Sequence, residues 1–312
     1  MSLLQKVRLK PSILTAFAFL TIPVFVTIIA VTYLSNDNLA RANAQELVER
    51  FRGEALENIQ SDFTPIKSLV RAAAAIGSQY PEFFADNRCF PYFHSILMHS
   101  ERIVSVYVGL SNGNFRQTRR IDPTVPVQDR LPPPDTRFAF RWIEPQVGPE
   151  KIDHYLFLDA ALKELGSSEA PTTYDPRTRF WYRGAAEAGV ETISDPDVFA
   201  TLGLIGFTVA APFYHAGKLH GVAAVDITLA GLGEYLAQRR ISPGTLSFIL
   251  DHQGRVIASS DGSKTYENVR GRLELVHVTS LQNELPAIAY SARPRGGSDG
   301  QFTFAYKGKE YV

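Results

Sequence analysis

The most apolar part of the chain is a run near its N-terminus. Residues 11–36 contain no charged side chain, and leucine, isoleucine, valine, phenylalanine, alanine and threonine dominate positions 13–34. About 20 apolar residues are enough for a helix to cross the hydrocarbon core of a bilayer. A cleaved signal peptide has a shorter apolar stretch and a small-residue cleavage site, which residues 32–36 do not offer. The pattern therefore predicts an uncleaved transmembrane helix over residues 12–34.

Three basic residues set the orientation of this helix. Lys6, Arg8 and Lys10 directly precede the apolar run, and positive residues next to a membrane span stay in the cytoplasm. Residues 1–11 are therefore predicted to be cytoplasmic, and the rest of the chain to emerge on the far side of a bacterial inner membrane, in the periplasm. Without these three cations the chain has 29 basic residues against 32 acidic ones.

The segment after the span has a helical pattern. Apolar residues recur there at alternating spacings of three and four, the rhythm of a helix with one buried seam. The seam consists of Leu56, Ile59, Phe63, Ile66, Val70 and Ala73. We expect a long stalk helix over residues 35–80, of about 60 Å at 1.5 Å per residue. Such a stalk can cover its own domain, pair with a second copy to form a homodimer, or do both.

The pattern then changes to the period of β-strands. Residues 103–110 are rich in β-branched and aromatic side chains, a Gly-containing turn follows, and residues 115–121 suit a returning strand. A similar strand–turn–strand unit recurs at residues 246–258. The repeat predicts an α+β fold with two tandem PAS-like modules of antiparallel sheet. We expect a membrane-distal module over residues 81–228 and a membrane-proximal module over residues 229–312, which looks incomplete at its C-terminal end.

Composition excludes several classes of function. The chain has 32 basic and 32 acidic residues, so it lacks the overall positive field on which many nucleic-acid-binding proteins rely. Its single cysteine, Cys89, cannot form an internal disulfide. The histidines lack close metal-ligand spacing, and common nucleotide-binding, hydrolase and metalloprotease motifs are absent. We therefore expect no catalytic site, metal or cofactor in residues 1–312, and no nucleic-acid partner.

One short segment combines cations, aromatic side chains and a proline turn. Residues 174–182 read Tyr-Asp-Pro-Arg-Thr-Arg-Phe-Trp-Tyr. The guanidinium of Arg179 can bind a carboxylate through two parallel hydrogen bonds, and the indole of Trp181 can add a third donor. Tyr174 and Tyr182 can supply apolar walls with polar tips. The same cluster could equally cap an ordinary core, so the residues alone leave both interpretations open.

The segment resembles the signature of the double Cache family of bacterial sensor domains. The resemblance rests on Tyr174, Arg179, Trp181 and Tyr182, followed by a strand that reads Gly-Val-Ala-Ala-Val-Asp and ends at Asp226. It covers about residues 35–312. It implies that Arg179 and Trp181 face a ligand carboxylate, that the two tyrosines shape the pocket, and that Asp226 pairs with an ammonium group. Asp226 could instead cap the helix expected near residue 229.

One position departs from the family pattern. Such sensors usually carry another tyrosine after a Ser/Thr-Asp-Pro turn, where this chain has Asp197. Asp197 is expected at the rim of the pocket. The substitution favours an amine or a more cationic ligand, or indicates that this subfamily no longer binds amino acids.

The sequence therefore predicts the periplasmic sensor portion of a transmembrane receptor. Its partners would be a lipid bilayer, a second copy, and an amino acid, amine or organic acid. The region around residues 194–212 resembles Cache proteins that carry an adenylate or guanylate cyclase domain, although a histidine kinase, a diguanylate cyclase or a chemoreceptor would use the same sensor. The alternative is a membrane-anchored periplasmic enzyme or assembly factor in which the arginine and aromatic residues are structural.

Overall fold

A computed structural model describes residues 9–144, 151–199, 203–240, 244–293, 302 and 304–311 of the chain. The chain divides into two compact units, Met1–Glu57 and Asn58–Val312. The first eight residues, which include Lys6 and Arg8 of the predicted cytoplasmic segment, lie outside the described residues.

Helix α1 (Leu9–Gln79) contains the predicted segment 12–34 and all of the predicted segment 35–80 except its last residue. Within the first unit, Phe17–Asn36 has a mean hydropathy of 2.3 and is long and apolar enough to cross a membrane. The hydroxyls of Thr21 and Thr27 each donate a hydrogen bond of 2.8 Å to the carbonyl one turn back. These bonds satisfy polar groups that lipid could not hydrogen-bond.

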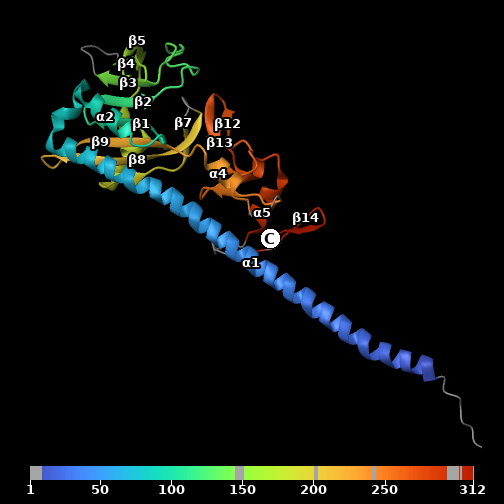
Figure 1. Ribbon diagram of the computed structural model, residues 1–312. Helices are drawn as coiled ribbons and strands as arrows, with labels where there is room; N and C mark the ends of the chain where they lie inside the picture. Colours follow the sequence, from blue (N-terminus) through green and yellow to red (C-terminus); the bar gives the residue numbers. More distant parts are fainter. Residues whose placement is uncertain are drawn as a thin grey trace, which may run out of the picture. The chain divides into compact units, whose positions relative to one another are not determined.

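The second unit is built around an antiparallel sheet of nine strands (Figure 1). The strand order is β5-β4-β3-β2-β1-β9-β8-β6, and β7 also pairs with β8. The strands are β1 (Ile103–Leu110), β2 (Phe115–Arg120), β3 (Phe138–Glu144), β4 (Lys151–Leu158), β5 (Glu164–Thr172), β6 (Thr192–Ile193), β7 (Asp197–Phe199), β8 (Leu204–His215) and β9 (Lys218–Thr228). The helices next to this sheet are α2 (Phe90–Leu97) and α3 (Phe180–Ala188).

One face of the sheet packs against α2 and against the part of α1 that belongs to the second unit. Alternation along each strand directs every second residue to this face. Val106 of β1, Val225 of β9 and Val209 of β8 are buried there together with Ile66 and Val70 of α1. The C-terminal half of the predicted apolar seam is therefore buried against its own domain.

The opposite face of the sheet packs against α3 and carries the candidate site. Tyr107 of β1 and Ala224 of β9 are buried there with Trp181 and Tyr182 of α3. These strand residues alternate with those of the other face, so the same two strands serve both layers. Helix α3 ends at Gly189, whose φ of 69° is in the left-handed region that glycine adopts readily.

The C-terminal part of the second unit contains three separate two-stranded sheets. They pair β10 (Phe248–Leu250) with β11 (Val256–Ser259), β12 (Tyr266–Val269) with β13 (Arg272–Leu275), and β14 (Phe304–Tyr306) with β15 (Lys309–Tyr311); the helices are α4 (Leu232–Gln238) and α5 (Glu284–Ala292). Strand β13 contacts β7 at the edge of the large sheet. The predicted α+β class, with antiparallel sheets and an N-terminal apolar helix, is confirmed. The predicted boundaries between modules stay a prediction.

Candidate functional site

A cavity of about 540 Å³ lies on the α3 face of the large sheet. This volume is in the range of small-molecule sites in proteins. Its walls come from the sheet, from the segment that leads into α3, from β7, and from the turn between β12 and β13. The lining residues are Tyr107, Phe115, Gln117, Tyr174, Arg179, Phe180, Trp181, Asp197, Val198, Phe199, Thr208, Asp226, Gly271, Arg272 and Leu273.

Five of the six residues predicted from the sequence line this one cavity. They are Tyr174, Arg179, Trp181, Asp197 and Asp226. The sixth, Tyr182, is buried next to Trp181, with their ring centroids 5.7 Å apart, and packs in the apolar layer between α3 and the sheet. The fold therefore brings five of the predicted residues to one cavity and places the sixth directly beside it. The role of all six in ligand binding stays a prediction.

Asp226 projects from the floor of the cavity, in the middle of the sheet. Antiparallel register places it opposite Thr208 of β8 and Ser105 of β1. Its Oδ1 atom accepts hydrogen bonds from the hydroxyl of Tyr107, at 2.6 Å, and from the hydroxyl of Thr208, at 2.7 Å. Both donors use the same oxygen, so Oδ2 makes no hydrogen bond with a described residue. That oxygen is available to a donor that enters the cavity.

Burial dominates the electrostatics of Asp226. It raises the pKa of this carboxyl to about 6, although the hydrogen bonds from Tyr107 and Thr208 and the charge of Arg119 lower it. Burial likewise raises the pKa of Tyr107 well above its ordinary value, and the neighbouring Asp226 adds to this effect. A carboxyl of this kind is mostly ionised at pH 7 but lacks the solvation that water would give it. A cationic group in the cavity would replace part of that solvation.

The two cations of the predicted segment have different surroundings. Arg177 pairs with Asp175, whose Oδ2 lies 2.6 Å from Nη2, and Asp175 also caps the short 3-10 turn over Pro176–Thr178. This ion pair holds the pKa of Asp175 well below its usual range. Arg179 makes no ion pair with a described residue, and its guanidinium lies 5.6 Å from the centre of the Tyr174 ring. Arg177 therefore fixes the turn, and Arg179 keeps its charge available to the cavity.

Trp181 and the sheet fix each other at the base of the cavity. The indole meets the ring of Tyr107 edge to face, at 4.9 Å between centroids. Gly109 makes this close approach possible, because a Cβ atom there would lie 2.6 Å from Pro176 Cβ and 2.9 Å from Trp181 Cη2. The placement of α3 therefore depends on a glycine in β1.

We expect Gly109→Ala to lower the free energy of unfolding by about 1–3 kcal/mol, the usual effect of overpacking. It should also shift the emission of Trp181, measured in a Trp142→Phe background that leaves one tryptophan. Gly184→Ala is the matched control, because its Cβ would meet no atom within 4 Å and alanine favours the α3 helix. Equal stability of the two variants would show that α3 does not depend on Gly109.

Asp197 lies on β7, opposite Gly206 of β8. Its Oδ1 accepts a hydrogen bond of 2.8 Å from the backbone N–H of Val198. Asp197 thus adds a second carboxylate to the cavity that Asp226 already faces. The predicted departure from the family pattern falls on a residue that lines the site.

The sequence analysis missed the polar residues that the sheet contributes. Tyr107 and Gln117 pair across β1 and β2, and Thr208 stands opposite Asp226. A signal was present in β2, where Phe115, Gln117 and Arg119 alternate with residues of the other face and are buried. Polar side chains at alternate positions of a buried strand indicate a polar cavity or a hydrogen-bonded network.

Two arginines, one buried and one mostly buried, lie beside the cavity in the same layer. Arg141 forms a two-point ion pair with Asp153, with both N···O distances at 2.8 Å, and stacks on Tyr174 at 4.8 Å. Arg119 is buried without such a pair; burial lowers its pKa, while Tyr155 and Asp226 favour its charged form. The charge of Arg141 is therefore balanced by Asp153. The charge of Arg119 interacts with Asp226, which lines the cavity.

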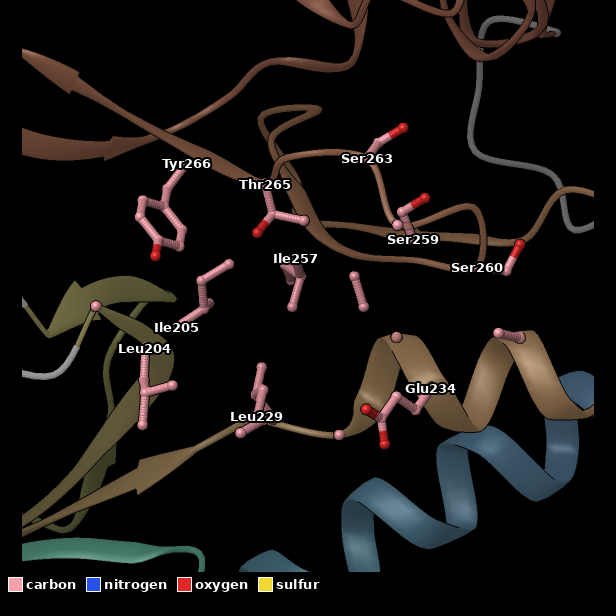
Figure 2. Close-up of a pocket in the computed structure, with 17 residues that line it drawn as sticks. Leu204, Ile205, Leu229, Glu234, Ile257, Ser259, Ser260, Ser263, Thr265 and Tyr266 are labelled. Carbon is pink, nitrogen blue, oxygen red and sulfur yellow. The ribbon is translucent and has the colours of Figure 1, made fainter.

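Figure 2 shows a second cavity, of about 380 Å³, between the ends of β8 and β9 and the segment from β11 to β12. Its lining is mainly small and hydroxyl-bearing, with Ser259, Ser260, Ser263, Thr265 and Tyr266 on one side. Glu234 of α4 is the one charged residue among the described residues that line it. Because no positively charged described residue lines it, this cavity is less suited than the first to bind a ligand that carries both kinds of charge.

Comparisons with known proteins agree with a sensor domain. Residues 132–234 match the family described as methyl-accepting chemotaxis protein-like, first PDC sensor domain. The chain is similar to adenylate cyclase 1 of Rhizobium meliloti, with 27% identity over 247 residues, which are 78% of this chain and 36% of that protein. It is 33% identical over 105 residues to the methyl-accepting chemotaxis protein McpA of Pseudomonas putida, covering 33% of this chain and 16% of that protein.

Among solved structures, the chain is similar to the ligand-binding domain of the Pseudomonas aeruginosa amino acid chemoreceptor PctC in complex with GABA. The TM-score is 0.48 with 22% identity, over 83% of this chain and 88% of that one. The chain spans about a third or less of the curated relatives named above. The match of residues 132–234 to a sensor-domain family confirms the predicted resemblance to bacterial sensor domains.

Proposed function

We propose that this chain is the periplasmic sensor portion of a membrane receptor, and that the 540 Å³ cavity binds a small molecule with a carboxylate and an ammonium group. The observation that carries the proposal is the pair of opposite charges in one cavity. Arg179 makes no ion pair with a described residue, and Asp226 directs an unused carboxylate oxygen into the same space. Such a pair is complementary to a zwitterionic ligand.

The anchor and its orientation belong to the same proposal. The apolar stretch Phe17–Asn36 would cross the inner membrane, with the basic N-terminal residues in the cytoplasm and the sensor domain in the periplasm. The N-terminal half of the apolar seam of α1, Leu56, Ile59 and Phe63, would support a homodimer. The similarity to an adenylate cyclase over 78% of this chain favours a cyclase as the output, and the similarity to chemotaxis proteins keeps a chemoreceptor as the second candidate.

Signalling requires more than affinity for the ligand. A ligand shifts an equilibrium between two receptor states only by the difference between its affinities for them. The cavity suits this role because its walls come from separate parts of the second unit, namely the large sheet, the segment that leads into α3, and the β12–β13 turn. A ligand that contacts all of them would favour the arrangement in which they are close together.

The test is a ligand screen on the full chain in lipid nanodiscs. The probes are L-glutamate, L-glutamine, glutarate and butylamine at millimolar concentration, and the readout is the thermal unfolding of the domain. A ligand at about 100 times its Kd should stabilise the fold by about 2.7 kcal/mol. We expect the amino acids to stabilise the chain more than glutarate or butylamine, which carry only one kind of charge. A failure of every amino acid to stabilise it would contradict the proposed function.

A further inference from the structure

The turn between β12 and β13 brings a second arginine to the cavity. Gly271, Arg272 and Leu273 line it, together with the residues of the large sheet and of the segment that leads into α3. The turn is tightly held, because Gly271 has a φ of 86° and its N–H donates a hydrogen bond of 2.7 Å to Asn268 Oδ1. Strand β13 contacts β7 (Figure 1). Because β7 carries Asp197, which lines the cavity, the turn lies beside this wall of the cavity.

Arg272 resembles Arg179 in its lack of a counterion. Neither guanidinium makes an ion pair with a described residue, and both side chains are exposed to solvent at the cavity. Most other arginines of the site region are paired, as Arg141 is with Asp153 and Arg177 with Asp175. Two unpaired guanidiniums that line one cavity can each bind an anionic group.

The charges around the cavity favour a ligand with net negative charge. Arg179, Arg272 and the adjacent buried Arg119 contribute three positive charges, and Asp197 and Asp226 contribute two negative ones. The charge of Arg141 is balanced by Asp153. A neutral zwitterion would leave one positive charge of this set uncompensated, whereas a ligand with one ammonium and two carboxylates would balance it.

We propose that Arg272 is a specificity-determining residue that binds a second anionic group of the ligand, so that the site selects acidic amino acids over neutral ones. This inference rests on the proposed function of the same cavity. Arg179 binds the α-carboxylate and Asp226 the α-ammonium, the two groups that all α-amino acids share. Arg272 binds the side-chain carboxylate. The ligand then joins the large sheet to the β12–β13 hairpin through Arg272, which lies 46 residues beyond Asp226 in the chain.

Two pairs of nearly isosteric probes isolate the second anionic group. They are L-glutamate with L-glutamine and L-aspartate with L-asparagine. Affinities are measured on the full chain in nanodiscs by the fluorescence of Trp181, in the Trp142→Phe background. In at least one pair we expect the acidic member to bind at least about 10-fold more tightly than the neutral member. A hydrogen bond between two charged groups contributes about this much to affinity.

Substitution of Arg272 then tests whether this residue causes the preference for the acidic probe. Arg272→Gln should remove it by weakening the acidic probe and leaving the neutral one unchanged. Arg270→Gln is the matched control, because Arg270 is exposed on the same turn and does not line the cavity. It should keep the full preference of the parent chain.

The possible outcomes separate the two proposals. Equal binding of acidic and neutral probes, or a preference that survives Arg272→Gln, would overturn the role of Arg272 and leave the proposed function intact. Loss of the preference in Arg270→Gln as well would indicate a general effect of charge on the turn, and would also overturn it. Failure of all four probes to bind the parent chain would contradict the proposed function itself, and this inference with it.

Discussion

Replacing Arg179 with alanine is expected to lower the affinity for a carboxylate ligand by about 10- to 150-fold, which corresponds to the 1.5–3 kcal/mol of hydrogen bonds to a charged group. The guanidinium makes no ion pair with a described residue, so its removal leaves no internal carboxylate without a partner. The fold should therefore keep its stability while the site loses affinity. Arg179→Lys should also bind poorly, because an ammonium cannot form the planar two-point contact of a guanidinium.

The matched control is Arg183→Ala, one turn further along α3. Arg183 is exposed and faces Glu187 at 3.8 Å, and it does not line the cavity. Titration of each variant with the ligand found in the screen, together with its thermal unfolding without ligand, separates binding from stability. If Arg179→Ala unfolds the domain, or if Arg183→Ala weakens binding as much, then the Arg179 cluster is structural.

The local patterns of the sequence predicted most of the elements that position the site. The β-branched run at residues 103–110 is strand β1, and the predicted strand that leads to Asp226 lies in β9. These two strands pair at the centre of the large sheet. Alternation along β9 places Val222 and Ala224 against α3 and Asp226 in the cavity, as expected for a period of two. These features depend on residues that are close together in the chain, so the pattern along the sequence is enough to predict them.

Other elements carried too little local signal. Strands β6 and β7 have two and three residues and exist because they pair with β8. Strand β5 has a glycine and a proline and is only partly buried, so neither composition nor alternation marks it as a strand. Short edge strands are determined by the sheet they join, and their own residues do not specify them.

The site was predictable in part, for a related reason. Arg179 and Trp181 stand in one unusual segment, and Asp226 lies near the end of a strand that the sequence pattern indicates. Tyr107, Thr208 and Arg272 come from three distant parts of the chain and meet at the cavity only through strand register and the contact of β13 with β7. Long-range pairing of this kind is not visible as a pattern along the sequence.

Replacing Asp226 with asparagine should stabilise the unliganded domain at neutral pH. Burial raises the pKa of Asp226 from its ordinary 3.8 to about 6. Between these two values the folded state binds more protons than the unfolded state, so stability falls as the pH rises through this window. Above pH 6 the buried charge costs on the order of 3 kcal/mol, at 1.36 kcal/mol for each pKa unit.

Asparagine removes that charge and keeps the shape of the side chain. Its Oδ1 can still accept the hydrogen bonds from Tyr107 and Thr208. Unfolding by urea should therefore show Asp226→Asn to be more stable than the parent at pH 7, and the difference should disappear near pH 4. Asp175→Asn is the control of opposite sign, because the pKa of Asp175 is lowered by Arg177 and its charge stabilises the fold at neutral pH.

Asp226→Asn should also lower the affinity for an amino acid ligand. Without the carboxylate, an ammonium in the cavity loses its charged partner, so amino acids should bind Asp226→Asn less tightly while glutarate keeps its affinity. In the parent chain, amino acid binding should weaken as the pH falls below about 6, because Asp226 becomes protonated. An unsatisfied charge that lowers stability and raises affinity is the usual compromise of a binding site. A variant that gained no stability at pH 7 and bound amino acids normally would show that Asp226 is a structural residue.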